Sequence, residues 1–298
     1  MEIKEGYVSF QGYRTYYRIA NPKGRKTPLL VLHGGPGSTH NSYEVFDDMA
    51  LEDDRPIVSY DQIGCGLSSL EDPHPALWKA KTWVDELINL RQALQLKEIH
   101  LLGHSWGGML AIIYLCDENP EGVVDVVLSS TLSSISLWCE ETHRLVKFLS
   151  SEEQEAIRKA EETRDFSSLE TEIANRHYAQ LFIGGPWGKD DPSCLTREKK
   201  FGSESYLSAW GESEYSPSGT LKDYEYTDKL KKFSCPVLLL SGANDESTPL
   251  QNKRMFEALQ SEKEWVLFAN SRHMSYVEEH RAYEEKVMTF LNRHERKE

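Results

Sequence analysis

Three observations predict an α/β protein with a mostly parallel sheet, flanked by helices and carrying an inserted helical cap. Short apolar runs alternate with helical patterns over most of the chain, as strands and helices do around a parallel sheet. Most of these runs end at a polar or glycine-rich loop. One long central stretch has no strand-like run. A chain of 298 residues is long enough for a large core with such an insertion.

Six short apolar runs are predicted to form the buried strands of the sheet. They cover residues 29–32, 57–60, 99–102, 123–128, 237–240 and 265–268. In open α/β sheets, ligands bind outside the carboxyl ends of the strands. We therefore expect the loops that follow these strands to share one site.

The change of pattern in the middle of the chain gives the domain boundaries. Residues 1–132 and 233–298 are assigned to the α/β core, and residues 133–232 to the helical cap. Segments 152–164 and 169–182 carry the clearest helical patterns of the cap. The charged tail, 290–298, is expected to fray.

Composition restricts the partners and the compartment of the protein. The formal net charge is −14 and no basic stretch occurs, so a nucleic-acid partner is not expected. No apolar run approaches the length of a membrane span, and the N-terminus has no pattern of a secretion signal. These features predict a cytoplasmic protein that does not bind a membrane. No pattern determines an oligomeric state.

Cysteine and histidine spacing gives no support for a metal or a disulfide framework. The five cysteines are scattered without a CxxC spacing, and their number is odd. The ten histidines include no HExxH pair. We therefore expect catalysis by side chains, without a cofactor.

The most informative segment is Gly103-His-Ser-Trp-Gly107, between the apolar run at 99–102 and a helical pattern. A GxSxG sequence between a strand and a helix is typical of a nucleophile elbow, in which Ser105 lies exposed at a sharp turn. Small glycines on both sides let the strand and the helix approach closely. The alternative is a glycine-rich turn with an incidental serine.

A serine nucleophile needs a base and an acid, and both should follow it in the order Ser, Asp or Glu, His. Asp245 follows the strand at 237–240, and His273 follows the strand at 265–268. His273 would take the proton of Ser105, and Asp245 would orient the imidazole. Alternatively, Asp245 is a turn residue before a helix cap and His273 lies in a surface loop. The occurrence of both in the required order favours a catalytic triad.

Two backbone donors are predicted to form an oxyanion hole. One is the N–H of Trp106, directly after the nucleophile. The other comes from the loop His33-Gly-Gly-Pro-Gly37, with Gly35 as the favoured donor, although a tight strand-exit turn would use the same residues. His33 is expected to be a structural hydrogen-bonding residue, because one base is sufficient.

In these motifs the sequence resembles the proline iminopeptidases, serine peptidases of the α/β-hydrolase fold. The resemblance covers nearly the whole chain and includes His33-Gly-Gly-Pro-Gly37, Asp61-Gln-Ile-Gly-Cys-Gly66, Gly103-His-Ser-Trp-Gly-Gly108 and Gly242-Ala-Asn-Asp-Glu246. One departure is Ile63, where the family commonly has arginine, which puts a structural ion pair in doubt. The fold implied is therefore that of an α/β hydrolase.

The resemblance also implies how the substrate is selected. Related aminopeptidases hold the free amine of the substrate with two glutamates, which correspond here to Glu246 and, in the cap, Glu214; Glu212 is an equal candidate by composition. Two carboxylates in a partly desolvated pocket would bind an ammonium and reject a blocked N-terminus. The aromatic residues of the cap receive no individual role. They are Trp138, Tyr178, Phe182, Trp187, Tyr206 and Trp210.

The sequence thus predicts an enzyme that releases an N-terminal residue, preferably proline, from short peptides through an acyl-enzyme. An amidase acting on amino-acid amides, or a prolinase acting on Pro-Xaa dipeptides, would use the same residues. A non-catalytic binding protein of the same fold is the alternative from another class. An esterase would leave the two glutamates without a purpose, and epoxide hydrolases and dehalogenases have aspartate in place of Ser105.

Overall fold

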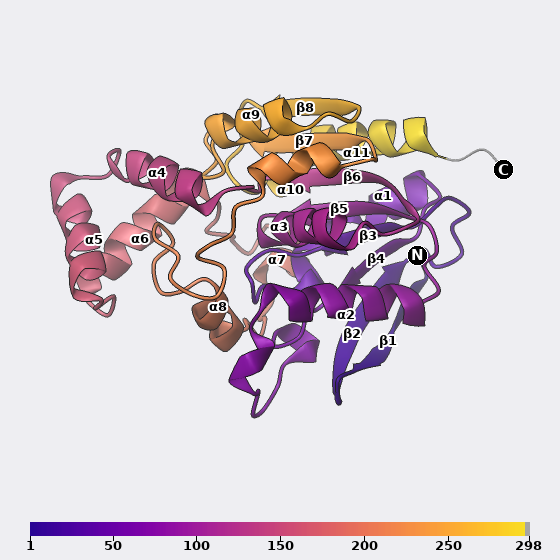
Figure 1. Ribbon diagram of the computed structural model, residues 1–298, viewed down its shortest axis with the longest axis horizontal. Coiled ribbons are helices and arrows are strands. Elements are labelled where there is room, and N and C mark those ends of the chain that lie inside the picture. Colours follow the sequence, from indigo (N-terminus) through magenta and orange to yellow (C-terminus); the bar gives the residue numbers. More distant parts are fainter. Residues whose placement is uncertain (296–298) are drawn as a thin grey trace.

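An eight-stranded sheet forms the centre of the molecule in the computed structural model, which describes residues 1–295 (Figure 1). The strand order is β1-β2-β4-β3-β5-β6-β7-β8. The strands are β1 (Ile3–Phe10), β2 (Tyr13–Ala20), β3 (Leu29–Leu32), β4 (Ile57–Tyr60), β5 (Ile99–His104), β6 (Val123–Ser129), β7 (Val237–Gly242) and β8 (Lys263–Phe268). Strands β3 to β8 pair in parallel. All six predicted strands are confirmed.

The first two strands were not predicted from the sequence. They form an antiparallel hairpin whose second strand pairs with β4. Gln11 and Gly12 connect them with φ of 48° and 85°, the left-handed conformation that tight hairpin turns require. Strand β1 lies at the edge of the sheet and is largely exposed. A strand with so few buried residues gives only a weak apolar pattern.

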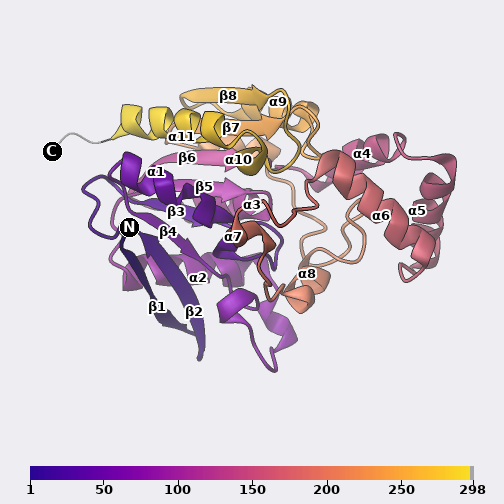
Figure 2. The same cartoon turned by 180° about the vertical axis from the view of Figure 1, so that it is seen from behind.

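Helices cover both faces of the sheet. One face packs against α2 (Ala80–Ala93), α3 (Trp106–Ile113) and α9 (Pro249–Ala258). The other packs against α1 (Asp47–Glu52), α10 (Ser275–Glu278) and α11 (His280–His294), which Figure 2 shows from that side. Neighbouring residues of β3 alternate between the two cores: Leu30 and Leu32 belong to the first, Leu29 and Val31 to the second. This two-sided burial explains why these strands are continuously apolar.

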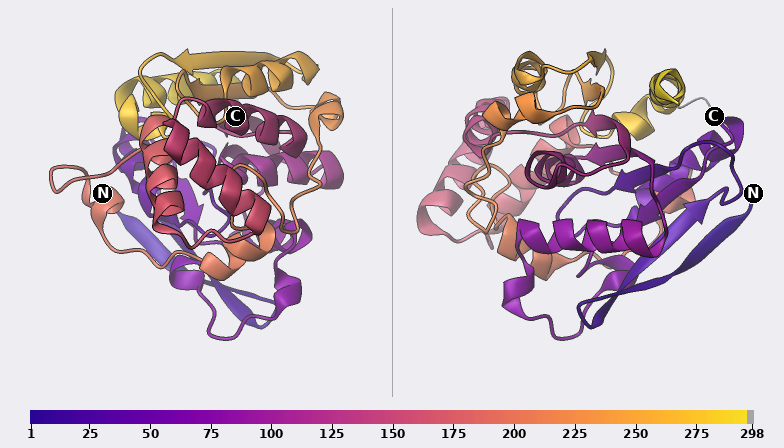
Figure 3. Two further views of the ribbon diagram at one scale, coloured as in Figure 1. Left: turned by 90° about the vertical axis from the view of Figure 1, so that its left-hand side faces the viewer. Right: turned by 45° about the vertical axis from the view of Figure 1, so that its right-hand side comes forward.

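The segment that we interpret as the cap is helical in the structure. It contains α4 (Ile135–Val146), α5 (Ser151–Thr163), α6 (Leu169–Phe182), α7 (Ser193–Thr196) and α8 (Ser203–Ala209). Figures 1 and 3 show α4, α5 and α6 beyond one end of the sheet. A small apolar cluster of its own stabilises this part. A β-bridge between Ser134 and Glu225 brings the two ends of the segment together.

Short helical turns complete the connections. They are the 3₁₀ turns η1 (His40–Phe46), η2 (Gly66–Ser68), η3 (Pro75–Leu77) and η5 (Thr227–Lys232), and the π-helical turn η4 (Tyr114–Glu118). Helix α7 packs against η1, so this part of the insertion lies on the core rather than beyond it. In the described part of the chain, no helix combines the length and the apolar composition needed to cross a bilayer.

The expectation that the tail frays is wrong for residues 290–294. Helix α11 continues through His294, and Phe290 and Leu291 are buried in the second core. Glu295 then accepts a hydrogen bond from the Thr27 N–H and pairs with Arg55. The charged residues between the apolar ones concealed a helical spacing. Residues 296–298 lie outside the described part.

Candidate active site

Ser105 lies at a sharp turn between β5 and α3. Its φ of 55° and ψ of −124° are a strained conformation for a residue with a side chain. A Cβ atom at Gly107 would lie 2.1 Å from the Leu32 carbonyl oxygen, and one at Gly103 would lie 2.3 Å from the Gly107 oxygen. The close approach of strand and helix therefore requires both glycines. The Ser105 amide donates to the Ser129 carbonyl of β6, which ties the turn to the sheet.

His273 and Asp245 form a buried pair at the ends of β8 and β7. The Nδ1 atom of His273 lies 2.7 Å from Asp245 Oδ1. That carboxylate also accepts hydrogen bonds from the backbone amides of Ser247, at 2.7 Å, and Gly242, at 3.4 Å. These bonds fix the carboxylate, so that Nδ1–H of His273 donates to it and Nε2 remains available.

The structure brings the Ser105 turn next to this pair. His104, one residue before Ser105, donates from Nε2 to the His273 carbonyl at 2.9 Å, and the two imidazole rings are 4.8 Å apart. Burial, then the neighbouring His273, lower the pKa of His104 to about 3, so its ring is neutral. Within residues 1–295, no hydrogen bond joins the Ser105 hydroxyl to His273. Catalytic hydrogen bonds often tighten only when substrate is bound.

The two predicted oxyanion donors lie on elements that flank Ser105. Trp106 begins α3, and amides in the first turn of a helix have no partner within the helix. In the glycine loop, a Cβ atom at Gly34 would lie 3.2 Å from the Ser105 Cβ, so the loop passes directly beside the nucleophile. Gly35 has φ of +116°, which favours glycine.

Gln62 connects the glycine loop to the elbow. Its N–H donates to His33 Nε2, and its side-chain amide donates to the His33 carbonyl, each at 3.0 Å. The same side chain accepts the Trp106 indole N–H at 2.8 Å. Burial lowers the pKa of His33 to about 4, and His33 Nδ1 bonds the Gly34 carbonyl. His33 is therefore a neutral structural residue, and three sequence motifs meet in one hydrogen-bond network.

Glu246 and Glu214 lie on opposite sides of the cap-core junction and approach the same place. Glu246 is 4% exposed, and its Oε1 lies 3.9 Å from His273 Nε2. Glu214 accepts a hydrogen bond from the Tyr206 hydroxyl at 2.5 Å. Burial raises the pKa of Glu246 well above its ordinary value, and the charges of Glu214 and Asp245 raise it further. Burial also raises the pKa of Glu214. Glu212, the alternative, is exposed.

Several buried polar atoms around these glutamates have no partner among residues 1–295. They are Glu246 Oε2, Tyr178 Oη and Trp210 Nε1. Buried polar groups are nearly always hydrogen-bonded to protein or to water, so these three atoms are free to bond to a ligand or to water. Tyr178 and Trp210 also pack in aromatic pairs with Tyr215 and Trp138. The place combines an acidic centre with apolar walls.

The end of α6 holds the loops that carry Glu246 and His273, a feature that the sequence did not predict. The Phe182 carbonyl accepts hydrogen bonds from the backbone amides of Glu246, at 3.3 Å, and His273, at 3.2 Å. Arg272 donates to the Gln180 carbonyl in the last turn of α6. Because a backbone carbonyl can come from any residue type, no sequence pattern signals these contacts.

Ile63 lies beside a buried acid that lacks a cation. Glu86 is fully buried and accepts hydrogen bonds from the Thr15 hydroxyl, at 2.5 Å, and the Ile63 amide, at 3.0 Å. No lysine or arginine of residues 1–295 pairs with it. Burial raises its pKa to about 8. Isoleucine carries no charge, so the side chain at position 63 makes no ion pair, and Glu86 is held by hydrogen bonds alone.

Comparisons with known proteins identify the family of the chain. The family model described as "alpha/beta hydrolase fold" matches residues 27–280. A curated proline iminopeptidase of Levilactobacillus brevis is 49% identical over 297 residues, covering 99% of this chain and 98% of the relative. One from Lactiplantibacillus plantarum is 50% identical, covering 97% of this chain and all of the relative.

Solved structures extend the similarity to three dimensions. The crystal structure of VinJ superposes with a TM-score of 0.88 at 29% identity, covering 97% of this chain and 98% of the other. The crystal structure of a Mycobacterium smegmatis proline iminopeptidase gives a TM-score of 0.86 at 27% identity, covering 98% of both chains.

Proposed function

Because the chain belongs to the proline iminopeptidase family of α/β hydrolases, we propose that it is a serine aminopeptidase that releases an N-terminal residue, preferably proline, from short peptides. Family membership supports the reaction class and the acyl-enzyme route. The geometry around Ser105 supports the assignment of individual residues. The substrate is a peptide with a free N-terminus.

In the proposed acylation step, His273 Nε2 takes the proton of the Ser105 hydroxyl as the oxygen attacks the carbonyl carbon of the first residue. The tetrahedral intermediate collapses when the C–N bond breaks and the imidazolium gives its proton to the leaving amine. Water then attacks the ester with the same base, releasing the free amino acid and restoring the serine. Asp245 holds Nδ1–H throughout, at 2.7 Å.

We assign the negative oxygen of each intermediate to the amides of Gly35 and Trp106. Their elements are fixed before substrate binds, because Gln62 links the glycine loop to the Trp106 indole. Preorganised donors stabilise the developing charge without rearrangement during the reaction. Removing one such donor typically reduces kcat by about 10²- to 10³-fold.

The free amine of the substrate is assigned to Glu214 and Glu246. Burial raises the pKa of Glu246, and repulsion by the Glu214 carboxylate raises it further. An ammonium placed between them removes this repulsion and donates to the unpartnered Glu246 Oε2. A blocked N-terminus has neither the charge nor the donors. This unpartnered buried oxygen beside the His273 ring is the observation that supports an aminopeptidase over an esterase.

The test is a panel of aminoacyl-coumarin amides, amino-acid amides and Pro-Xaa dipeptides, with Ser105→Ala as control. Turnover is expected to be fastest with prolyl-coumarin and to disappear in the control. Preference for amides would identify an amidase, and activity confined to dipeptides would identify a prolinase. A serine-reactive phosphonate is expected to label Ser105. Absence of both labelling and turnover would favour a non-catalytic binding protein.

We propose a cytoplasmic location and the division into a core, 1–132 with 233–298, and a cap, 133–232. All five cysteines are free, which suits a reducing compartment. The separate apolar cluster of the cap helices supports the division. Expression of the fluorescently tagged full chain and cell fractionation test the location.

A further inference from the structure

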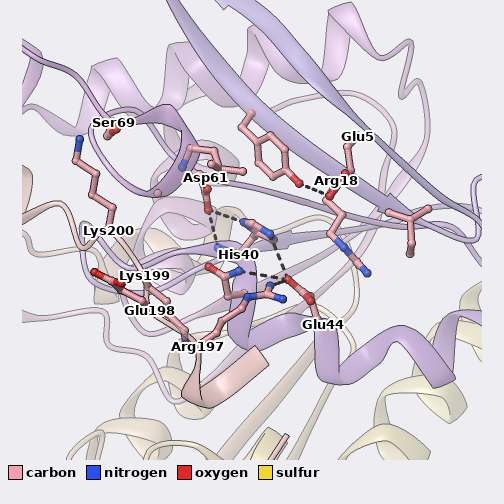
Figure 4. Close-up of a pocket in the computed structure, with 15 residues that line it drawn as sticks. Glu5, Arg18, His40, Glu44, Asp61, Ser69, Arg197, Glu198, Lys199 and Lys200 are labelled. Carbon is pink, nitrogen blue, oxygen red and sulfur yellow. Dashed lines mark hydrogen bonds and ion pairs between the residues drawn. The ribbon is translucent and has the colours of Figure 1, made fainter. Parts of the chain in front are cut away.

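A chain of alternating charges lies outside the proposed catalytic residues. It consists of Asp61, His40, Glu44 and Arg197, and we call it the charge chain. Figure 4 shows these four side chains meeting in a cavity of about 790 Å³ between the N-terminal hairpin, η1 and the segment after α7. They come from three parts of the sequence: the end of β4, η1, and the cap segment.

His40 occupies the centre of the charge chain. Its Nδ1 lies 2.7 Å from Asp61 Oδ1, which also accepts the His40 backbone N–H at 2.8 Å. Its Nε2 lies 3.4 Å from Glu44 Oε1. Glu44 in turn pairs with Arg197. The His40 side chain is 5% exposed and that of Asp61 is 1% exposed, so their interaction is shielded from water.

The same three segments are joined by backbone hydrogen bonds near the glycine loop. The Gly202 amide donates to the carbonyl of Gly37, the last residue of the glycine loop, at 2.8 Å. The Gly66 amide donates to the Lys200 carbonyl at 2.7 Å. The cap segment 197–202 therefore runs between the glycine loop and the loop after β4. The charge chain crosses the same junction three residues beyond Gly37.

The surroundings of His40 favour its charged form. Burial by itself lowers the pKa of His40, but hydrogen bonds to Asp61 and Glu44 outweigh it and raise the pKa above the ordinary value of 6.5. The Tyr16 ring packs 5.0 Å from the imidazole. The neighbouring cations do not pair with His40: Arg18 is engaged by Asp47, Arg197 by Glu44, and Lys199 makes no ion pair within residues 1–295. His33, the other nearby imidazole, is neutral.

We propose that His40 is a positioning residue for the glycine loop, residues 33–37, which carries the assigned oxyanion donor Gly35. As an imidazolium held between Asp61 and Glu44, it fixes the loop that carries Gly35 against the β4 loop and the cap. This inference rests on the proposed function, because it concerns the efficiency of the same site. Loss of the His40 charge releases the loop and reduces the stabilisation of the oxyanion, without changing the residues that hold the substrate amine.

The test is His40→Gln, with His280→Gln as a matched control. His280 has the same i,i+4 geometry as His40, with Nε2 3.4 Å from Glu284 Oε2, but it lies on α11. For His40→Gln we expect kcat on prolyl-coumarin to fall about tenfold, with KM within about twofold of wild type. The control is expected to keep both constants. An unchanged kcat in folded His40→Gln would overturn the proposal, as would an equal loss in the control.

The pH profile separates positioning from a purely structural effect. Since the pKa of His40 is raised, its charge is complete below pH 6.5 and is lost as pH rises through the higher value. Wild-type kcat is therefore expected to decline on the alkaline side through a group that is missing in His40→Gln, whose kcat stays low at every pH. Glu44→Gln should move this decline to lower pH, because one of the two carboxylates is lost. An identical decline in all three proteins contradicts the proposal.

Two further measurements keep the inference distinct from the proposed function. The rate of Ser105 labelling by a phosphonate depends on the oxyanion hole but needs no peptide. If wild type cleaves no prolyl substrate, the proposed function fails, and slower labelling of His40→Gln still supports the positioning role. If His40→Gln does not fold, the pH profile of Glu44→Gln decides: movement of the alkaline decline in kcat to lower pH supports the proposal, and an unmoved decline overturns it.

Discussion

Two adjacent carboxylates in this molecule, Asp245 and Glu246, are both buried and yet are treated in opposite ways. Asp245 is 1% exposed and accepts from His273 and two backbone amides. Glu246 is 4% exposed, one of its oxygens has no partner in the described chain, and the other lies 3.9 Å from Nε2 of His273. The two carboxylates are buried to a similar extent, but only that of Asp245 has all its hydrogen bonds made within the protein.

Under the proposed function, this difference separates the residues that perform the chemistry from those that recognise the substrate. A base must have the correct tautomer before the reaction, so its partner is fixed in the folded protein. A group that binds an ammonium must leave its acceptor free for the ligand. A buried carboxylate that lacks hydrogen-bond partners reduces the stability of the free protein, and the ligand supplies the missing hydrogen bonds. The hydrogen bonds of His273 and Asp245 are therefore complete without substrate, and those of Glu214 and Glu246 are not.

The largest effect is expected from Asp245→Asn, which breaks the complete pair. Asparagine at 245 no longer favours the Nδ1–H tautomer of His273. We expect kcat to fall by about 10³- to 10⁴-fold, with KM little changed, in steady-state assays on prolyl-coumarin. Unfolding by denaturant checks that the variant remains folded. An increase in KM with unchanged kcat would show that this carboxylate belongs to substrate binding.

A smaller loss is expected from Glu246→Gln, which removes one charge from the incomplete pair. A hydrogen bond to a charged group contributes about 1.5–3 kcal/mol, so kcat/KM for free-amine substrates should fall by about 10- to 100-fold. Glu212→Gln serves as the control, since Glu212 is exposed. An equal loss of kcat/KM in Glu246→Gln and Glu212→Gln would show that Glu246 has no particular part in binding the amine.

The same Glu246→Gln change should stabilise the free protein. The raised pKa of Glu246 means that the folded state binds a proton more tightly than the unfolded state. Stability contributed by this group is therefore present below pH 4.5 and is lost as pH rises towards the raised pKa. We expect the variant to gain roughly 2 kcal/mol at pH 8 and little at pH 4, measured by urea unfolding. A destabilised variant at pH 8 would contradict the idea of an unsatisfied acid.

The smallest effect is expected at the cap contact beside His273. Arg272 donates to the carbonyls of Gln180 and Gly185 and pairs with Glu278. Arg272→Lys keeps the charge but loses the two-sided geometry. We predict a two- to fivefold loss in kcat, with a stability change of about 1 kcal/mol. Lys253→Arg, on the exposed side of α9, should change neither.

Side-chain signals in the sequence predicted the sheet and the candidate residues. The six parallel strands are buried on both faces, so each is a continuous apolar run with a defined end. Ser105, Asp245 and His273 each follow such an end, where a parallel sheet collects its functional loops. The sequence therefore located the candidate site through the strands, although three-dimensional contacts were needed to show its network.

What the sequence did not predict depends on contacts without a side-chain signature. The edge strand β1 has few buried residues, and the buried stretch of β2 includes the polar residues Thr15 and Arg18, which interrupt an apolar run. The Gln11-Gly12 turn between them lacks the more typical asparagine or aspartate. The Phe182 carbonyl, which holds the loops of Glu246 and His273, is a backbone group. His40 becomes informative only when folding places it between Asp61 and Glu44.

The most direct test of the account compares prolyl-coumarin with its N-acetylated form. The acetyl group removes the ammonium and leaves the scissile bond and the triad unaffected. We expect wild type to cleave the free form at least about 100-fold more efficiently, and Glu246→Gln to reduce this ratio. Equal kcat/KM for the two substrates would contradict this expectation, because the incomplete glutamate pair would then have no part in recognition.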